Sequence, residues 1–528
     1  MTFAPSRRIL WPVCAVLAAT ALILGVACSR PVAAPPDAKP AADAPADKGA
    51  DDCPMFGRTV ARNLANPVEK NITDKWSIKK NKEKGVKWKA VLGGIAFGGP
   101  SIAGGRIFVG TNNGKPRDPA VDGDKGVVMC FNEADGAFLW QIVHDKLTND
   151  IDEGGQGVAS TPAVDGDRLY YVSNRCELVC ADVAGDPAAK GKGKIVWSLD
   201  MIKEFKVYPG GLMGSVANCS PLVLDDLVYV VTSNGVDLTT RKVASPDAPS
   251  FLAVHKESGK VAWQSNLPGA NIMDGQWSNP AAAEVNGVKE VIFPGGDGWL
   301  YGFEAKKGEL LWKFDCNPKK SEFKPDAGAA TRNYIVATPV VADGKLYVGV
   351  GREPDEGPGL GHLWCIDLTK KPAAKDKDLS PVGDNFDPKA AVNKDSGLVW
   401  HFGGALDPKP ADAVRDYAFG RTLSACAVHD GLVYAADLDG FFYCLDAKTG
   451  RLYWQHDLGG ATWSSPYYVD GKVFMGVDNG DLLIFAAGKE DKVLDKIDMV
   501  QPMKVPPVAA NGVLYVNNGA MLYAIAPK

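Results

Sequence analysis

The sequence predicts an all-β fold: an eight-bladed β-propeller of four-stranded antiparallel blades, with the ring closed by an N-terminal outer strand. Three observations predict it. A twelve-residue phrase that ends in tryptophan recurs along the chain, as in "YCLDAKTGRLYW" (443–454). Asp-Gly and Asn-Gly pairs recur between short apolar runs. Units that carry these features follow one another from residue 98 onward, and there are eight of them.

The paired turn residues predict hairpins within each unit. Both central residues of a type I′ turn need positive φ, which Asn, Asp and Gly tolerate best. The turns are expected between the first and second strands of their units, at Asp165-Gly166, Asn286-Gly287, Asp343-Gly344, Asp430-Gly431, Asp470-Gly471 and Asn511-Gly512. Four short strands repeated at this period indicate propeller blades.

The eight units are recognised by their first strands, and the last unit is incomplete. The first strands begin in "GGPSIAGGRIFVG", "ASTPAVDGDRLYYV", "NCSPLVLDDLVYVV", "SNPAAAEVNGVKEVIF", "ATPVVADGKLYVGV", "LSACAVHDGLVYAA", "SSPYYVDGKVFMGV" and "PPVAANGVLYVNN". The eighth unit stops after its third strand, at "MLYAIAPK". Residues 85–93, with Trp88, are therefore predicted to supply its outer strand, which closes the ring and removes an exposed sheet edge.

A tryptophan stands at the outer-strand position of seven units. Each blade must dock on its neighbours, and a large flat side chain fills the wedge between two blades. These tryptophans are interpreted as structural rather than as a cofactor site: Trp88, Trp140, Trp197, Trp263, Trp312, Trp400 and Trp454. The seventh unit has "KVLDKIDM" instead, where Ile497 is the expected substitute.

The N-terminal region predicts export. Residues 1–28 join a basic start to an apolar stretch, as in a secretion signal, and Cys28 is a candidate for lipidation. The usual lipoprotein motif has Leu three residues before the cysteine, where this chain has Gly25, so an ordinary cleaved signal or an uncleaved anchor are the alternatives. Residues 29–52 are expected to be a disordered Pro/Ala/Asp-rich tether. Residues 53–84 form an N-terminal extension, and residues 85–528 form the propeller.

The repeated phrase Ala/Asp-x-x-x-Thr/Ser-Gly-x-x-x-Trp, clearest in "LDAKTGRLYW", resembles the docking motif of pyrroloquinoline-quinone-type (PQQ-like) propellers. That superfamily includes quinoprotein alcohol dehydrogenases and the propeller lipoprotein of the outer-membrane β-barrel assembly machinery. The resemblance spans about residues 85–528. "CPMFGRTVARNLANP", "GQWSNPA" and "GHLWCIDLTKK" are similar to a narrower family of exported PQQ-like repeat proteins, common in planctomycete-type bacteria. The resemblance implies the fold and leaves the activity open.

Two functions from different classes follow. The favoured hypothesis is a non-catalytic binding or scaffolding propeller at the periplasmic cell envelope, monomeric and membrane-associated only through its N-terminus. The alternative is a PQQ- and Ca²⁺-dependent quinoprotein dehydrogenase. Such enzymes often pack a disulfide of adjacent cysteines on the quinone, and this sequence has no adjacent cysteines and no complete Ca²⁺ ligand run. We therefore expect no cofactor, no metal site and no catalytic residues.

Composition and charge restrict the class of partner that this protein is expected to bind. The formal net charge is −5 and no basic block or basic-aromatic stripe occurs, which argues against nucleic acid. An envelope protein or a small ligand is the expected partner. Of the eleven cysteines, those at 130, 180, 365 and 444 share one repeat position, where cysteine behaves as a small buried hydrophobe.

The candidate binding face is the one where the long loops emerge. Links from strand two to three, and from blade to blade, leave a propeller on the same face, and 111–126, 232–250 and 351–362 are long. Residues on these links, most of them just before inner strands, are the candidate ligand- or partner-binding set: Asp274, Trp277, Arg332, Asn333, Arg352, His362, Arg421 and Trp463. The alternative is that they only satisfy loop backbone, and for His362 that it is a hydrogen-bonded residue at a strand start.

The fifth unit carries an insertion between its third and fourth strands. Residues 369–397 are rich in Lys, Asp and Pro and lack a core pattern. We expect an exposed mobile excursion there, tolerated rather than functional.

Overall fold

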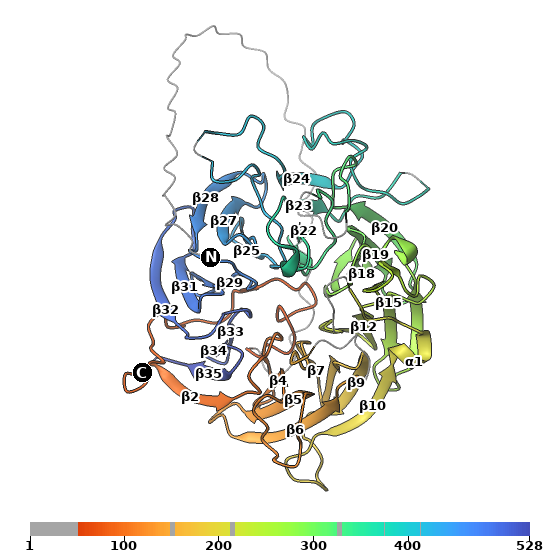
Figure 1. Ribbon diagram of the computed structural model, residues 1–528. Helices are drawn as coiled ribbons and strands as arrows, with labels where there is room; N and C mark the ends of the chain where they lie inside the picture. Colours follow the sequence, from red (N-terminus) through yellow and green to blue (C-terminus); the bar gives the residue numbers. More distant parts are fainter. Residues whose placement is uncertain are drawn as a thin grey trace.

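Eight four-stranded antiparallel sheets surround a central channel in a computed structural model of the chain (Figure 1). The structure describes residues 51–147, 154–211, 217–324, 330–373, 375–411 and 413–527. The predicted signal (1–28), Cys28 and the predicted tether up to residue 50 lie outside these residues. Among the described residues, no helix combines the length and apolar character needed to cross a membrane.

Each blade runs from an inner to an outer strand, as the repeats predict. Blades one to four are β3 (Ser101–Ala103), β4 (Arg106–Asn112), β5 (Lys125–Asn132), β6 (Phe138–Asp145); β7 (Ala163–Asp165), β8 (Arg168–Val172), β9 (Glu177–Asp182), β10 (Lys194–Asp200); β11 (Leu222–Leu224), β12 (Leu227–Val231), β15 (Phe251–His255), β16 (Val261–Ser265); and β17 (Ala281–Val285), β18 (Val288–Pro294), β19 (Trp299–Glu304), β20 (Leu310–Asp315). Blades five to seven are β21 (Val340–Ala342), β22 (Lys345–Val350), β23 (His362–Asp367), β24 (Leu398–Gly403); β25 (Ala427–His429), β26 (Leu432–Ala436), β27 (Phe441–Asp446), β28 (Leu452–Asp457); and β29 (Tyr467–Val469), β30 (Lys472–Gly476), β31 (Asp481–Ala486), β32 (Val493–Asp498).

The eighth blade closes the ring as predicted. Its strands β33 (Val508–Ala510), β34 (Val513–Asn517) and β35 (Met521–Ile525) come from the C-terminal end, and β2 (Val86–Val91) is the fourth. β2 pairs antiparallel with β35, with Trp88 opposite Ala524. Because every blade then lies between two others, the ring has no open end.

A short α-helix, a hairpin and 3-10 turns lie in the links between the blade strands. The helix α1 (Met201–Phe205) follows β10, and its first turn is capped by the Asp200 side chain, which accepts from the Lys203 N–H. The hairpin β13 (Val236–Asp237) and β14 (Lys242–Val243) lies in the 232–250 loop. The 3-10 turns η1 (Gly269–Asn271) and η2 (Pro354–Glu356) lie in links on the same face.

Five of the six predicted turns have positive φ at both central residues, as type I′ requires: those at 286, 343, 430, 470 and 511. The sixth differs by one position. In blade two, β7 extends through Asp165, so that the connecting residues are Gly166 and Asp167, and only the glycine has positive φ.

The docking tryptophans explain the twelve-residue phrase. Six of the seven indole N–H groups donate to a backbone carbonyl of the next blade, for example Trp400 to Ala447 at 3.0 Å and Trp88 to Glu133 at 3.0 Å. The glycine of the phrase in that next blade packs directly on the ring, as Gly450 does on Trp400. Trp312 is the exception, since it donates to the Glu290 carboxylate of its own blade at 2.7 Å. The expected substitution by Ile497 in blade seven is wrong: Asp495, opposite Ile484, has the place that Trp454 has opposite Cys444, and the buried Ile497 lies two residues further along β32, opposite Leu482.

The N-terminal extension threads the channel, which the sequence did not predict. Its residues 53–66 bond to the inner strand of every blade, or to the residues that lead into it. The contacts, in blade order, are Cys53 with Ile102, Pro54 with Val164, Arg62 with Ser220 and Pro221, Val60 with Ala282, Ala61 with Val341, Asn63 with Val428, β1 (Ala65–Asn66) parallel to β29, and Asn66 with Ala509. The extension therefore fills the channel toward the face of the hairpin turns.

After the channel, the extension crosses the hairpin-turn face of blade seven. The Ile72 N–H donates to the Asp470 carboxylate at 3.0 Å, and Trp76 packs on Phe474. Lys75 then reaches the outer strand, pairing with Asp495 at 3.1 Å, before the chain enters β2.

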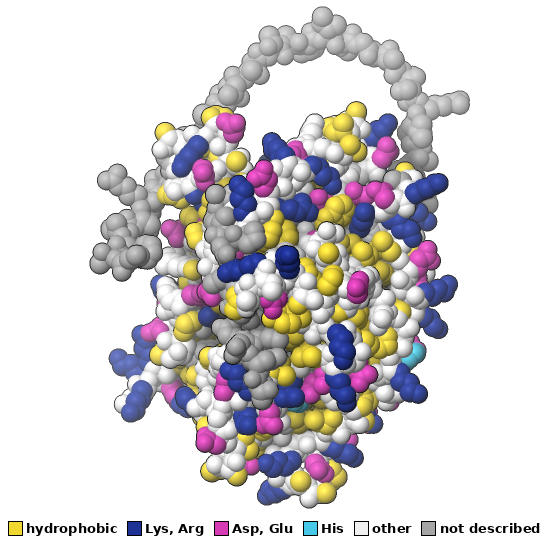
Figure 2. Space-filling view, turned by 45° about the vertical axis from the view of Figure 1, so that its right-hand side comes forward, with side chains coloured by type: hydrophobic (Ala, Val, Ile, Leu, Met, Phe, Trp, Pro, Cys, Tyr) yellow, Lys and Arg dark blue, Asp and Glu magenta, His cyan; other side chains and the backbone are white. Residues whose placement is uncertain are grey.

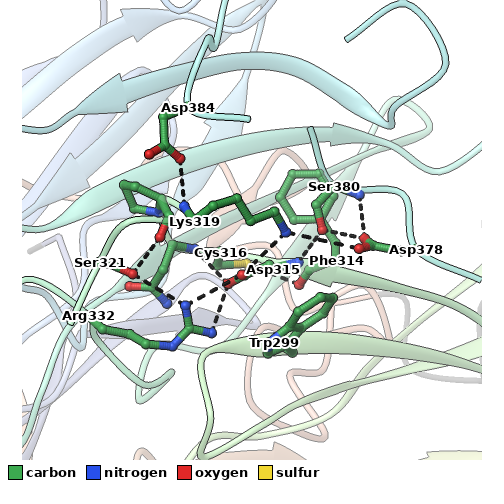
Figure 3. Close-up of polar contacts among 12 residues, drawn as sticks. Trp299, Phe314, Asp315, Cys316, Lys319, Ser321, Arg332, Asp378, Ser380 and Asp384 are labelled. Carbon is green, nitrogen blue, oxygen red and sulfur yellow. Dashed lines mark hydrogen bonds and ion pairs between the residues drawn. The ribbon is translucent and has the colours of Figure 1, made fainter. Parts of the chain in front are cut away.

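The expectation that residues 369–397 are simply exposed is wrong. Residues 377–379 pair in parallel with Lys313 on the outer edge of β20, and Leu379 is buried. Phe386 packs edge-on against Trp364. Within the insertion, the Asp378 carboxylate accepts a hydrogen bond from the Ser380 N–H, and the Asp384 carboxylate accepts one from the Lys319 N–H. Both bonds lie next to the Arg332–Asp315 ion pair (Figure 3). Leu379 and Phe386 hold the segment against the propeller. Two isolated apolar residues are too few to form a recognisable sequence pattern.

Candidate functional site

A cavity of about 260 Å³ lies at the centre of the loop face. Most of its wall comes from the links that lead into inner strands, and blade five adds Glu353, Pro354 and Asp355 from its long loop. Phe56 of the N-terminal extension also lines it. Because the extension fills the channel beyond, the cavity is a blind funnel rather than a passage through the ring.

A chain of polar residues surrounds the neck of this funnel. Each residue occupies the same place in its own blade and bonds to its counterpart in the next: Thr161 N–H to Ser220 Oγ at 3.0 Å, Ser220 N–H to Asn279 Oδ1 at 2.6 Å, and Asn279 Nδ2 to Thr338 Oγ1 at 2.7 Å. Gly99 with Thr161, and Ala425 with Ser465, continue the series. These bonds hold adjacent blades together and fix the positions of the lining side chains.

One wall of the funnel is aromatic and cationic. Trp463 and Phe97 are stacked with ring centres 6.2 Å apart. The Lys504 ammonium lies 3.5 Å from the centre of the Trp463 ring, a cation–π contact. No carboxylate of the described residues lies within ion-pair distance of Lys504. A half-buried ammonium on an aromatic wall is suited to an acidic or polar group carried by a partner.

The opposite wall carries Trp277 above a carboxylate network. The Tyr334 hydroxyl lies 2.7 Å from the Asp274 carboxylate and 3.0 Å from that of Glu356, and it accepts from the Glu353 N–H at 2.7 Å. Trp277 packs edge-on against Tyr334. Burial, with the nearby Asp355 charge, raises the pKa of Glu353 to about 7.

Two of the eight predicted site residues, Trp277 and Trp463, line the funnel. Asp274 lies behind Trp277, in contact with Tyr334, and the buried Asn333 donates to the Leu360 carbonyl at 2.9 Å. Of the eight predicted site residues, the two tryptophans are therefore the ones that lie on the funnel wall.

The three predicted arginines do not line the funnel. Arg332 pairs with Asp315 at 3.0 Å, and the buried Arg352 pairs with Glu356 at 2.6 Å. Arg421 is fully buried and donates to loop carbonyls, including that of Ala330 at 3.2 Å. These contacts favour the alternative in which arginines at these positions hold the loops.

His362 is buried at the start of β23, away from the funnel lining. Its Nδ1 lies 2.8 Å from Nε2 of His401 on the neighbouring strand. Burial lowers the pKa of His362 to about 3, so the ring stays neutral. A neutral, hydrogen-bonded histidine pair beside Trp364 is a packing arrangement.

Sequence reasoning missed most of the other lining residues, among them Phe56, Phe97 and Lys504. Phe97 and Lys504 stand just before inner strands, as Trp277 and Trp463 do, so the same positional rule applied to every blade would have found them. No repeat signal marks Phe56, because it belongs to the extension.

The lining does not suit pyrroloquinoline quinone, which carries three carboxylates. Among the described residues that line the funnel, Lys504 is the one cation, and Glu353 and Asp355 present carboxylates opposite it. The nine cysteines of the described residues are all buried and unpaired. In the same part of the chain, no group of three or more His, Cys, Asp or Glu is placed to hold a metal ion.

Comparison with known proteins gives the family. The protein-family model described as "Outer membrane protein assembly factor BamB" matches residues 124–372 and 390–493. BamB of Yersinia pestis is 21% identical over 375 residues, which cover 68% of this chain and 80% of that protein. Polyvinylalcohol dehydrogenase of Sphingopyxis sp. is 24% identical over 332 residues, covering 58% of this chain but 45% of that protein.

A solved structure shows the same architecture. BamB from Moraxella catarrhalis superimposes with a TM-score of 0.51 at 13% identity, covering 83% of this chain and 96% of that one. At this identity the likeness speaks for the fold alone. The family model, in contrast, matches well over half of the chain. This protein therefore belongs to the family described as outer membrane protein assembly factor BamB.

Proposed function

We propose that this protein is an exported, non-catalytic binding module of the cell envelope, and that a partner protein docks on its loop face with one side chain in the funnel. The observation that carries the proposal is the facing pair of walls, Trp277 on one side and Lys504 on Trp463 and Phe97 on the other. Aromatic side chains around a concave centre are typical of binding hot spots.

The size of the funnel supports a protein partner over a larger ligand. Sites that enclose drug-sized molecules occupy about 300–1,000 Å³. At about 260 Å³, this funnel suits one inserted side chain, with the surrounding loops making the rest of the interface. An apolar or aromatic residue followed by an acidic one would match Trp463 and Lys504.

The surface charge supports the same proposal. Lysines and arginines are interspersed with acidic residues over the visible face, with hydrophobic side chains between them (Figure 2). This mixed surface gives no continuous basic track for nucleic acid. Location in the periplasm, with an anchor on Cys28, rests on the N-terminal sequence and on what the BamB relatives are named for.

The test is a cross-linking pull-down from intact envelopes with Trp463→Ala and Lys504→Glu. Each variant should lose the partner that the unaltered protein retains, without a change in Tm. Lys70→Glu is the matched control, since it makes the same charge change at an exposed residue on the opposite face. Retention of the partner by both funnel variants would refute the proposal.

The quinoprotein alternative is tested on the same preparation. Protein purified with PQQ and Ca²⁺ present is assayed for quinone absorbance and dye-linked alcohol oxidation. Stoichiometric quinone together with oxidation would establish the dehydrogenase instead.

A further inference from the structure

The chain twice covers the outer edge of a blade with an extra extended segment. In blade one, Gln141 of β6 pairs in parallel with residues 191–193: its N–H donates to the Gly191 carbonyl at 3.1 Å, and its carbonyl accepts from the Gly193 N–H at 2.8 Å. Residue 192 thus lies beside Gln141 as an added strand would.

Blade four repeats this arrangement. Lys313 of β20 donates to the Lys377 carbonyl at 2.9 Å and accepts from the Leu379 N–H at 2.9 Å. Gln141 and Lys313 each directly follow a docking tryptophan, Trp140 and Trp312. The residue after the tryptophan therefore presents its N–H and carbonyl outward, away from its own blade.

In blade two, the residue at this position is Ser198. Trp197 stands opposite Cys180 and Ser198 opposite Val179, which is the register that Trp140 and Gln141 have in blade one. Within the described residues, no backbone group pairs with Ser198 on its outer side. β10 lies at the rim of the ring (Figure 1), and Ser198 is exposed.

The side chains around Ser198 distinguish β10 from the outer strands of blades three and six. Ile195 is 44% exposed and Val196 is 42% exposed, and no residue of β10 is fully buried. The equivalent residues in blades three and six, Gln264 and Gln455, have no such exposed apolar pair before them. An exposed edge beside apolar side chains is the usual setting for strand addition.

Charge indicates what kind of segment would fit. Lys194 at the beginning of β10 and Lys190, four residues before it, are exposed, and no carboxylate of the described residues lies within ion-pair distance of either. In a parallel pairing, these lysines face the N-terminal part of an added strand.

We propose that the edge of β10 is a second docking site, distinct from the funnel. It takes an extended segment of a partner polypeptide, in parallel, with an acidic residue near the segment's N-terminal end and apolar residues at alternate positions. The segment makes with Ser198 the two backbone hydrogen bonds that residues 191–193 make with Gln141, and its apolar side chains cover Ile195 and Val196. This site does not depend on the proposed role of the funnel.

The test uses ten-residue peptides selected from a random display library on the full chain. Selected peptides should show the acidic and alternating apolar pattern and should slow hydrogen exchange at the Ser198 amide. Ser198→Pro removes that N–H at an edge position where proline is tolerated, and should weaken binding at least about tenfold. Ser198→Ala, which keeps the N–H, and Gln455→Pro, the equivalent change in blade six, should bind as the unaltered protein does.

Ile195→Lys is a second variant that leaves the backbone intact, and it should also weaken binding. Equal binding by Ser198→Pro and the unaltered protein, or protection of amides elsewhere, would overturn the proposal. So would failure of the library to yield binders. A dimer in sedimentation that Ser198→Pro dissolves would also overturn it, because the occupant would then be a second copy of the chain.

Discussion

Gly450 lies against the indole of Trp400 in the preceding blade, so closely that an added Cβ would come within 2.6 Å of the ring. The contact joins the glycine and the tryptophan of two copies of the repeated phrase across a blade interface. The phrase recurs because a blade that carries it supplies the glycine for one neighbour and the tryptophan for the other.

Gly450→Ala is therefore expected to destabilise the fold by about 3 kcal/mol or more, through a positive φ and a steric clash together. Chemical denaturation measures the change. Gly471→Ala is the matched control: its φ is similarly positive, +71°, but an added Cβ meets nothing within 4 Å. The control should lose only about 1 kcal/mol. Equal losses would mean that the Trp400 contact contributes nothing.

Arg62 fixes the extension in the channel. It is fully buried, and its guanidinium donates to the carbonyls of Pro280, Phe56, Ser220 and Pro221 at 2.9–3.0 Å. Burial lowers the pKa of Arg62 to about 10, so it remains charged at neutral pH. Arg62→Ala leaves these acceptors without their donor.

We expect Arg62→Ala to reduce the free energy of unfolding by about 3 kcal/mol or more. Hydrogen exchange should also accelerate at residues 53–66 before the blades open. Lys70→Ala, an exposed change in the same extension, should alter neither measurement. Unchanged exchange in Arg62→Ala would show that the blade contacts alone hold the extension.

Glu353 gives the stability a pH dependence. Its pKa is raised by burial to about 7 in the folded protein, above the ordinary value of 4.5 for a glutamate. The folded protein therefore binds a proton at Glu353 more tightly than the unfolded chain does. This proton contributes to the free energy of unfolding fully below about pH 4.5, and the contribution is lost as the pH rises through 7. Glu353→Gln stays neutral throughout.

The Tm of Glu353→Gln should match that of the unaltered protein at pH 4.5 and exceed it at pH 8. Asp297, whose pKa burial raises to about 6, contributes to both proteins and cancels in the comparison. Parallel melting profiles for the two proteins across this range would contradict the assignment.

Trp88 tests ring closure. It lies on β2, and its indole N–H donates to Glu133 of blade one, so it connects the closing blade to the first. Trp88→Ala should cost about 3–5 kcal/mol and promote aggregation by loosening the closing strand. Lys87→Ala, the exposed neighbour, should have little effect. Light scattering and thermal denaturation of the two variants decide this.

The blades and their closure could be predicted because each depends on local signals: two-residue turns, alternating strands and a tryptophan in seven of the eight units. The path of residues 53–66 could not. Its contacts are mostly backbone hydrogen bonds to distant strands, as from the Val341 N–H to the Ala61 carbonyl, and backbone groups leave no trace in the sequence.

The candidate site was predicted in part for a related reason. Position before an inner strand correctly located Trp277 and Trp463 on the funnel wall. The same rule does not predict the direction in which a long side chain points. Arg421 points into the loops, because its guanidinium donates hydrogen bonds to loop carbonyls there. Lys504 has the same position but stands in a stretch without other charges, and it was not singled out.

The central claim, that the funnel receives a side chain of an envelope partner, is tested most directly by site-specific photo-cross-linking in intact envelopes. A photoreactive residue replaces Phe97 on the funnel wall or, for comparison, exposed Lys70 on the opposite face. We predict one discrete protein adduct from position 97, abolished by Lys504→Glu, and none from position 70. Equal adducts from both positions, or an adduct from position 97 that survives Lys504→Glu, would contradict the account.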